Sequence, residues 1–324
     1  MSENKISHHI SHISHRERKV LVLVGPTASG KTRVSLKLSK KLDGEIVSAD
    51  SRQVYRFMDI GTAKPSKKEL EQVPHHFIDI LTPDKKYNAS EYSKQARQVI
   101  DEIFVRGKVP IVVGGSGLYI KALVDGFFEV DSMNEEIRNY LNERLLNEGA
   151  EILLEELRKV DPVAAASMVP GNKKRIVRAL EVYQTTGIPI SQLQKKNIPA
   201  EFTPCFVGLQ WERKQLYERI NERVELMFDL GLMDEVKNFQ SIGYSQSLNA
   251  LQTVGYREVF EHLSGKTSYK EMVELIKRNS RRYAKRQLTW FRADERIKWF
   301  ELHVESEVEN ISENIISYFN NYRF

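Results

Sequence analysis

The residues with the clearest chemical potential form one short run near the start of the chain. Gly25-Pro-Thr-Ala-Ser-Gly30-Lys31-Thr32 matches the pattern GxxxxGK[ST] and lies between a predicted apolar strand, residues 20–24, and a predicted helix, residues 31–42. In that setting backbone amides, the helix amino terminus and the lysine face phosphate oxygens, while the threonine hydroxyl ligates Mg²⁺. The run therefore predicts a diphosphate- or nucleotide-binding site made of Gly25, Pro26, Thr27, Ala28, Ser29, Gly30, Lys31 and Thr32.

An acid follows the second predicted strand, residues 45–48, in the segment Ser48-Ala-Asp-Ser-Arg-Gln53. The carboxyl ends of parallel strands meet at one ligand-binding edge, so Asp50 is expected near the phosphate loop. There its carboxylate is suited to accept a proton from an attacking nucleophile. Aspartate is equally common as the amino-terminal cap of a helix, and the residues alone leave both roles open.

A second loop of small residues, Gly114-Gly-Ser-Gly-Leu-Tyr119, follows a strand predicted at residues 109–113. It falls on the same edge of the sheet, and its glycines permit close approach of the backbone to a ligand. Ser116 adds a hydroxyl group. We favour a loop that lines the site over a plain strand-to-helix turn because of the edge that it occupies.

The elements that position these residues alternate between strand and helix. Such alternation indicates an α/β fold with right-handed crossovers, here a P-loop NTPase-like parallel sheet. Between residues 130 and 199 the pattern is wholly helical. We therefore expect a catalytic core of residues 19–129 and 200–324, ending in helices, and an all-helical insertion domain of residues 130–199. Further strands are expected at residues 77–81, 205–209 and 297–300, with a helix at residues 90–106.

Composition limits the class of protein. The 324 residues are 41% hydrophobic and 29% charged, which suits two lobes with a sizeable core. No apolar run approaches the roughly 18 residues of a membrane-spanning helix. The single cysteine, Cys205, cannot form an internal disulfide and is expected to pack in the core. These features favour a cytoplasmic protein, expected to be a monomer, and the polar residues 1–18 are expected to form a disordered leader.

The formal charge of +5 is unevenly distributed. Lys277 to Arg292 carries seven Lys or Arg residues and no acid, and a second basic cluster lies at residues 173–178. The longer basic run favours RNA, whose phosphates supply affinity, over a merely solvated helix face. Trp290 and Phe291, at the end of the longer cluster, are expected in the core rather than stacked on bases.

In several ordered stretches the chain resembles the tRNA dimethylallyltransferase family, from about residue 19 to residue 300. Eukaryotic members often add a zinc-finger tail, which needs several cysteines. With one cysteine, the chain resembles the bacterial members. The agreement of several motifs in the same order is more specific than the phosphate loop alone. The motifs are GPTASGKT at residues 25–32, SADSRQVYRFMDIGTAKP at 48–65, HHFIDI at 75–80, GGSGLYIKAL at 114–123, KKRIVRALEVY at 173–183, VGYRE at 254–258 and AKRQLTWFR at 284–292.

The resemblance implies that a dimethylallyl group passes from dimethylallyl diphosphate to N6 of adenosine 37 in tRNAs that read codons beginning with U. Mg²⁺ is the implied cofactor, held through the Thr32 hydroxyl beside Lys31. Asp50 would be the general base, and Arg223 would help to hold the diphosphate. Ser116 stands where the family often has threonine and would keep the role of that hydroxyl.

The resemblance also implies that tRNA is the partner, with the insertion domain contacting the anticodon arm. Tyr55 would help to line the acceptor pocket. The implied tRNA contacts are Asp50, Ser51, Arg52, Gln53, Ser116, Arg138, Lys174, Arg175, Ile176, Val177, Arg178, Gln252, Thr253, Val254, Gly255, Tyr256, Arg257, Lys285, Arg286 and Arg292.

Three other functions share part of this pattern. An adenylate isopentenyltransferase acting on free nucleotides would use the phosphate loop and Asp50 but would have less need of basic helices. A P-loop kinase or an RNA-binding ATPase would bind ATP in the same loop. Prenyl transfer to tRNA, prenyl transfer to AMP and phosphate release from ATP distinguish these functions.

Overall fold

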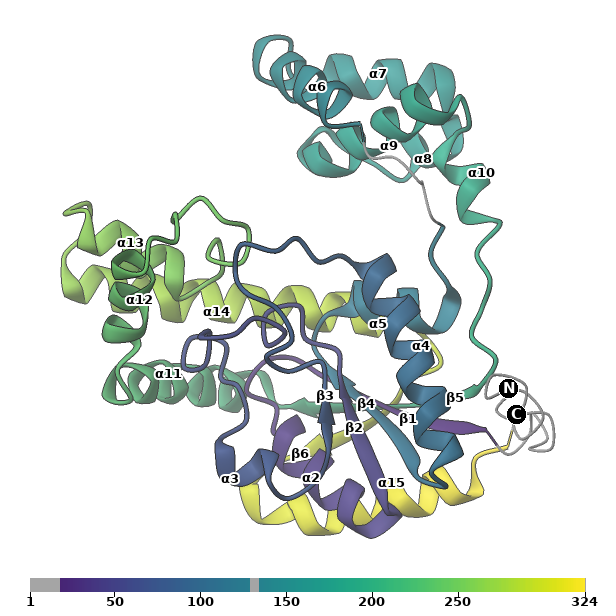
Figure 1. Cartoon of the computed structure of the whole chain (residues 1–324), viewed down its shortest axis with the longest axis vertical. Helices are drawn as coiled ribbons and strands as arrows, with labels where there is room; N and C mark the ends of the chain where they lie inside the picture. The colour runs from purple at the N-terminus through teal and green to yellow at the C-terminus, as the bar shows by residue number, and fades with distance from the viewer. Residues whose placement is uncertain (1–17, 129–133, 324) are drawn as a thin grey trace, which may run out of the picture. The chain divides into compact units, whose positions relative to one another are not determined.

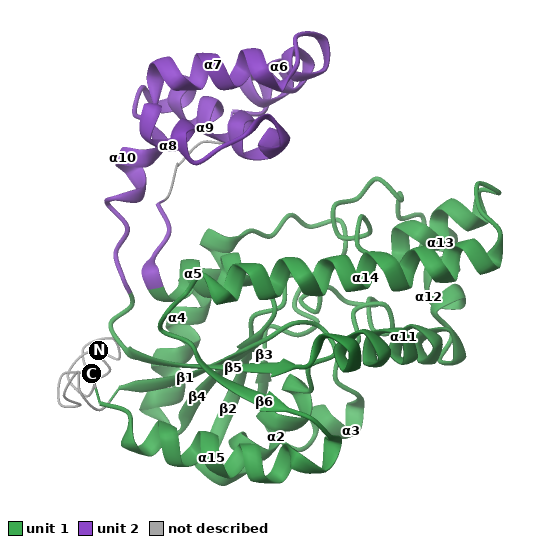
Figure 2. Ribbon diagram, turned by 180° about the vertical axis from the view of Figure 1, so that it is seen from behind, with its two compact units in different colours: residues 1–124, 200–324 green, residues 125–199 purple. Residues whose placement is uncertain are grey.

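The computed structural model describes residues 18–128 and 134–323 (Figure 1). The chain forms two compact units, residues 1–124 with 200–324 and residues 125–199 (Figure 2). The insertion was expected to begin at residue 130. The expected leader lies outside the described residues except for Arg18. No helix in the described part of the chain is long and apolar enough to span a bilayer.

The larger unit is built on a six-stranded sheet in the order β3-β2-β4-β1-β5-β6, with every pair of neighbours parallel. Parallel sheets need both faces covered, and the side chains of the central strand β1 are accordingly buried from Val20 to Val24. The predicted P-loop NTPase-like α/β class is confirmed. The strands are β1 (Lys19–Val24), β2 (Gly44–Ser48), β3 (His75–His76), β4 (Val109–Gly114), β5 (Thr203–Trp211) and β6 (Lys298–Leu302).

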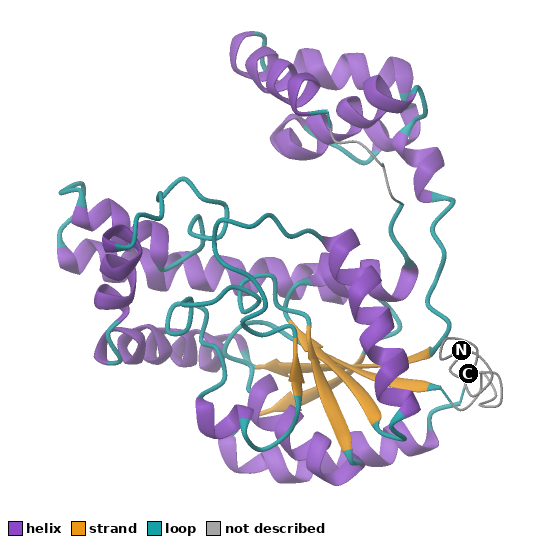
Figure 3. Ribbon diagram, in the orientation of Figure 1, coloured by secondary structure: helices purple, strands orange, loops and turns teal. Residues whose placement is uncertain are grey.

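Helices lie on both faces of this sheet (Figure 3). Leu21 and Leu23 of β1 belong to a core cluster with Leu38 of α2 and with Ile315 and Phe319 of α15. Cys205 lies in the same cluster, and burial raises the pKa of its thiol to about 12, so it packs as predicted. The helices of this unit are α2 (Lys31–Leu42), α3 (Lys67–Leu70), α4 (Ala89–Val105), α5 (Gly117–Asp125), α11 (Arg213–Asp229), α12 (Leu232–Ser241), α13 (Tyr256–Leu263), α14 (Tyr269–Arg292) and α15 (Val308–Asn321).

The smaller unit has its own apolar core, in which Leu141, Leu153, Leu157, Ile176 and Leu180 are buried. Its described residues form helices and turns without a strand, as its apolar spacing predicts. The chain leaves the larger unit at Val124 and returns at Ala200, whose N–H donates to the Val124 carbonyl at 2.8 Å. The helices are α6 (Glu135–Asn147), α7 (Ala150–Val160), α8 (Pro162–Ala166), α9 (Lys173–Thr186) and α10 (Ile190–Gln194).

The strand expected at residues 77–81 was wrong, because β3 ends at His76. Phe77 and Asp79 have φ values of 64° and 55°, in the left-handed region that interrupts an extended strand. The segment instead curls back along residues 53–56, with Ile80 N donating to Val54 O at 2.9 Å. The Asp79 carboxylate pairs with the buried ammonium of Lys64, which holds this turn.

Candidate active site

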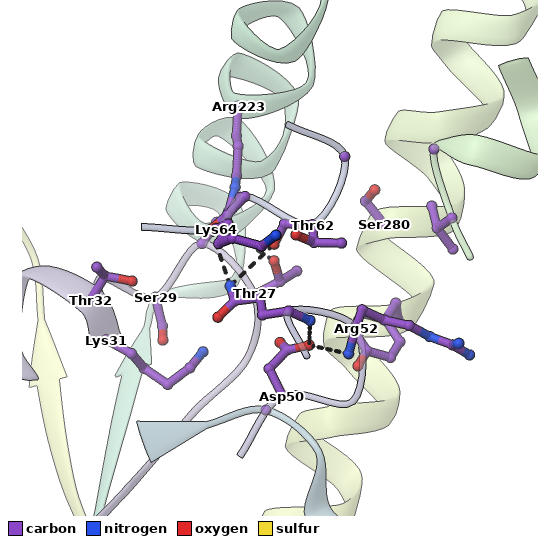
Figure 4. Close-up of a pocket in the computed structure, with 18 of the residues that line it drawn as sticks. Thr27, Ser29, Lys31, Thr32, Asp50, Arg52, Thr62, Lys64, Arg223 and Ser280 are labelled. Carbon is purple, nitrogen blue, oxygen red and sulfur yellow. Dashed lines mark hydrogen bonds between the residues drawn. The ribbon is translucent and has the colours of Figure 1, made fainter. Parts of the chain in front are cut away.

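A cavity of about 910 Å³ lies where the predicted phosphate loop, the Asp50 segment and the glycine loop after β4 converge (Figure 4). The carboxyl ends of neighbouring parallel strands bring these loops together. Helix α11 lines it with Arg219 and Arg223, and helix α14 with Ser280, Tyr283 and Gln287. Residues far apart in sequence therefore share one concave site, as a binding or catalytic function requires.

The phosphate loop has the expected shape. Gly25 lies so close to β5 that an added Cβ would be 2.8 Å from the Leu209 carbonyl oxygen, so glycine is required there. The Lys31 ammonium donates to the carbonyls of Gly25 at 2.9 Å and Pro26 at 2.7 Å. Burial and, after it, the nearby positive charge of Arg223 lower the pKa of Lys31 to about 7, although the Asp50 carboxylate partly opposes the shift. A phosphate anion bound in the loop would restore a charged lysine.

The oxygen donors around this loop fit a hard cation. They are the Thr32 hydroxyl, the Asp50 carboxylate and the Ser29 Oγ, which is buried and has no hydrogen-bond partner in the described part of the chain. No group of three or more His, Cys, Asp or Glu side chains suited to a metal occurs among the described residues. Mg²⁺ commonly binds through few protein oxygens together with phosphate and water, so the site suits a metal that arrives with a diphosphate.

Two arginines of α11 reach the phosphate loop. Arg223 donates from Nη1 to the Thr27 hydroxyl at 3.2 Å, and Arg219 donates from Nε to the Ala28 carbonyl at 2.9 Å. The Arg219 guanidinium also lies 4.1 Å from the ring centroid of Trp211. Only Arg223 was assigned a role from the sequence, although the four-residue spacing places both arginines on one helix face.

Asp50 stabilises a turn and does not cap a helix. Its Oδ1 accepts backbone N–H groups of Arg52 at 2.8 Å and Gln53 at 3.3 Å, and the next helix along the chain, α3, begins only at Lys67. The helix-cap alternative was therefore wrong. The carboxylate lines the cavity beside Lys31, where a proton acceptor is useful.

Ser116 is hydrogen-bonded to both neighbours of Asp50. Its Oγ accepts the N–H of Ser51 at 3.0 Å, and its own N–H donates to Ala49 O at 3.2 Å. Gly114 and Gly115 line the cavity, whereas Ser116 is not among its lining residues. Its hydroxyl thus braces the segment that carries Asp50.

A carboxylate that the sequence did not single out secures another wall. Glu235 of α12 accepts three successive backbone N–H groups, those of Asp59 at 2.9 Å, Ile60 at 2.8 Å and Gly61 at 3.0 Å, and the Tyr256 hydroxyl at 2.6 Å. Gly61 lines the cavity, and an added Cβ there would meet the Tyr256 ring at 2.4 Å. Helices α12 and α13 therefore hold the loop at residues 59–61.

Several expected RNA contacts have other surroundings. Ile176, Val177 and Tyr256, expected as tRNA contacts, are at most 5% exposed and pack in the core, as does Tyr55, which was expected to line the acceptor pocket. Among the expected contacts at residues 252–257, Gln252, Thr253, Val254 and Gly255 line the cavity, while Arg257 is exposed. The sequence patterns include Ile176, Val177 and Tyr256 because apolar or aromatic positions are interspersed with exposed ones along helices α9 and α13.

The basic side chains divide into paired and exposed ones. Arg138 and Arg178 both pair with the buried Glu181, at 3.0 and 3.1 Å. Arg257 is exposed and pairs with Glu258. The other exposed basic members of the expected set form no ion pair among the described residues; they are Lys174, Arg175, Lys285, Arg286 and Arg292.

The two aromatic residues at the end of α14 differ. Phe291 is 3% exposed, as predicted, but Trp290 is 45% exposed, so its prediction as a core residue was wrong. An added Cβ on Gly117 would lie 2.2 Å from the Trp290 ring, so the indole lies over a residue without a side chain. A ring that covers a glycine at the surface keeps its outer part in solvent.

Comparison with known proteins agrees with this geometry. A family model described as IPP transferase matches residues 53–294. A tRNA dimethylallyltransferase of Alkaliphilus oremlandii is 45% identical over 305 residues, which cover 94% of this chain and 97% of that protein. A tRNA dimethylallyltransferase of Carboxydothermus hydrogenoformans is 47% identical over 302 residues, 92% of this chain and 96% of that protein.

Solved structures give the same result. The tRNA isopentenylpyrophosphate transferase of Bacillus halodurans is 39% identical, with a TM-score of 0.69 and coverage of 94% of this chain and 97% of that chain. A eukaryotic dimethylallyltransferase acting on tRNA is 27% identical, with a TM-score of 0.81 and coverage of 94% of this chain and 79% of that chain. The chain therefore belongs to the IPP transferase family.

Proposed function

We propose that this enzyme transfers a dimethylallyl group from dimethylallyl diphosphate to N6 of adenosine 37 in tRNAs that read codons beginning with U, and releases diphosphate. One observation carries the proposal: a single cavity joins a phosphate loop, with Lys31 and Arg223, to the carboxylate of Asp50. The first group suits a leaving diphosphate, and the second suits an amine that must lose a proton. The names of the relatives support tRNA as the acceptor.

The residues of the phosphate loop stabilise the leaving group. As the bond between C1 of the donor and its diphosphate oxygen breaks, negative charge grows on the diphosphate. The loop amides, Lys31 and Arg223 face that charge, and preorganised donors of this kind make large contributions to catalysis. Mg²⁺, held by the diphosphate with Thr32, would neutralise part of the same charge. Lys31 exchanges its two loop carbonyls for phosphate oxygens when the donor binds.

Asp50 acts on the acceptor. The adenine N6 amine is a weak nucleophile because its lone pair is delocalised into the ring. Asp50 orients the amine, and its carboxylate takes the N6 proton as the bond from N6 to C1 forms, a role typical of a general base. The backbone N–H groups of Arg52 and Gln53 hold the carboxylate by Oδ1. Alignment of amine and donor carbon supplies a further part of the rate, up to roughly 7–11 kcal/mol.

The acceptor base must leave its stack to enter the cavity, at a cost of a few kcal/mol. We propose that contacts to tRNA phosphates offset this cost. The exposed cations of α14, among them Lys285 and Arg286, and those of α9, Lys174 and Arg175, would supply these contacts. The helical unit would thus grip the anticodon arm. We expect this enzyme to act in the cytoplasm as a monomer.

The test incubates the protein with Mg²⁺, labelled dimethylallyl diphosphate and unmodified tRNA carrying adenosines 36 to 38. We expect label in the tRNA, mapped to adenosine 37. Parallel reactions contain AMP in place of tRNA, or ATP in place of the donor. Label in AMP alone would identify an enzyme of free nucleotides, and phosphate release from ATP without prenyl transfer would identify a kinase or ATPase.

A further inference from the structure

A buried glutamine on α14 joins two loops of the cavity. Gln287 is 6% exposed; its Oε1 accepts the N–H of Thr27 at 2.8 Å, and its Nε2 donates to the Gly115 carbonyl at 2.9 Å. Thr27 belongs to the phosphate loop after β1, and Gly115 belongs to the loop after β4. One side-chain amide therefore links loops that follow different strands of the sheet.

The fit between Gln287 and Gly115 is close. A Cβ added at Gly115 would lie 2.2 Å from the glutamine Nε2, so a larger residue would displace the amide. One partner needs an acceptor and the other needs a donor. A neutral amide supplies both, whereas an ionised carboxylate accepts only and a thioether donates nothing.

From Gly115 the linkage continues to Asp50. Ser116, the next residue, accepts the N–H of Ser51 at 3.0 Å and donates its own N–H to Ala49 O at 3.2 Å. Asp50 lies between these two anchored residues. Gln287 thus stands between the loop that would hold the leaving diphosphate and the segment that carries the proposed base.

We propose that Gln287 is a positioning residue that sets the spacing between the phosphate loop and the Asp50 segment. The proposal rests on the prenyl transfer proposed above. Without the amide, the Thr27 N–H and the Gly115 carbonyl lose their buried partner, and the loops must move to satisfy them. A shift of about 1 Å in an aligned pair of reactants can lower the rate about 10²-fold. The loss therefore falls on kcat, while the groups that bind each substrate remain.

The experiment compares wild-type enzyme with Gln287→Met, which keeps the length of the side chain without its amide. Transfer of labelled dimethylallyl to tRNA should show a kcat lower by about 10²-fold, with KM values for both substrates close to those of wild type. Gln215→Met is the matched control, because Gln215 is a half-buried glutamine of α11 whose Oε1 has no hydrogen-bond partner in the described part of the chain. The control should keep the wild-type kcat.

Gly115→Ala reaches the same contact from the other side and should also lower kcat. Its effect should be smaller when combined with Gln287→Met than in the wild-type background, since both changes break one contact. A Gln287→Met enzyme with normal kcat, or with a loss confined to one KM, overturns the proposal. If this variant does not fold, Gln287→Glu replaces it under the same criterion. A wild-type enzyme that transfers nothing to tRNA would instead reject the proposed function, and this inference with it.

Discussion

Arg223 donates a hydrogen bond of 3.2 Å to the Thr27 hydroxyl, so a cation of α11 is fixed over the phosphate loop. Burial lowers the pKa of Arg223, as expected for a cation held away from solvent. The guanidinium lies close enough to Lys31 for its positive charge to help lower the pKa of that ammonium. Two buried like charges are costly without an anion, and this favours a doubly charged ligand between them.

Replacement of Arg223 by lysine should weaken donor binding. Lysine keeps the charge but loses the planar fork that matches phosphate oxygens. A hydrogen bond to a charged group contributes about 1.5–3 kcal/mol, so we expect KM for dimethylallyl diphosphate to rise about 10- to 10²-fold. Arg213→Lys is the control, since that guanidinium lies over the Tyr217 ring, 5.3 Å from its centroid. Equal donor KM values in the two variants would show that Arg223 does not contact the diphosphate.

Asp50→Asn should lower turnover far more than tRNA affinity. Asparagine retains an oxygen for the N–H groups of Arg52 and Gln53, so the turn persists, but it cannot accept the amine proton. We expect the rate constant of transfer, measured under single-turnover conditions, to fall about 10²–10⁴-fold. The control, Asp43→Asn, affects an aspartate paired with Lys108 at 2.5 Å and should be neutral. An unchanged rate for Asp50→Asn would remove it from the mechanism.

Arg282 and Arg286 on α14 are exposed, and no ion pair joins either of them to an acid within the described residues. Their joint replacement by alanine should weaken tRNA binding and reduce the slope of log affinity against log salt by about 1–2. Lys37 and Lys41 are suitable controls, because both already pair with acids of α15. The same salt slope for both double variants would place α14 away from the RNA.

Glu235→Gln should destabilise the loop at residues 59–61. The carboxylate now accepts four hydrogen bonds, and an amide presents one oxygen to the same donors. We expect the free energy of unfolding to fall by about 1–3 kcal/mol in urea titrations. The neighbouring Asp234→Asn should be neutral, because its partner Lys237 is exposed. A loss of equal size in both variants would contradict a special role of Glu235.

Stability at acid pH should depend on Glu45. Its side chain is 7% exposed and pairs with Arg106 at 2.8 Å and His76 at 2.7 Å. The hydrogen bond from Arg106, followed by that from His76, lowers the pKa of this carboxyl despite its burial. A lowered folded-state pKa stabilises the protein above the unfolded value near 4.5, and that stabilisation is lost as pH falls below it. Glu45→Gln should therefore be destabilised at pH 7, with a smaller further loss on acidification.

Local patterns predicted the phosphate loop and its helix well. The helix expected at residues 31–42 is α2, Lys31–Leu42, because a strand, a glycine turn and an amphipathic run each depend on neighbouring residues. The strand predicted at residues 77–81 was wrong because the conformation there depends on a distant residue. Its apolar residues suit a strand, but Asp79 pairs with Lys64, fifteen positions earlier, and the backbone turns there. A contact of that range leaves no periodic signal.

The site residues that were not predicted from the sequence also depend on contacts between distant parts of the chain. Gln287 lies on a basic helix and looks like an ordinary polar position. Its two partners are 260 and 172 residues away along the chain, so only the folded sheet brings them together. The role of Glu235 is equally hard to predict from the sequence, since it accepts hydrogen bonds from backbone N–H groups that almost any residue could supply. Trp290 was misplaced because its exposure depends on Gly117, on a different helix.

The hydrogen bond between Ala200 and Val124 has a consequence for how this chain can change over time. The helical unit is one continuous insertion, residues 125–199, and the two residues that flank it are hydrogen-bonded to each other. Deletion of the unit would leave two chain ends close enough for a short turn to connect, with the sheet unchanged. The helical unit can therefore be lost, gained or exchanged, in evolution or by engineering, without rebuilding the core that carries the candidate site.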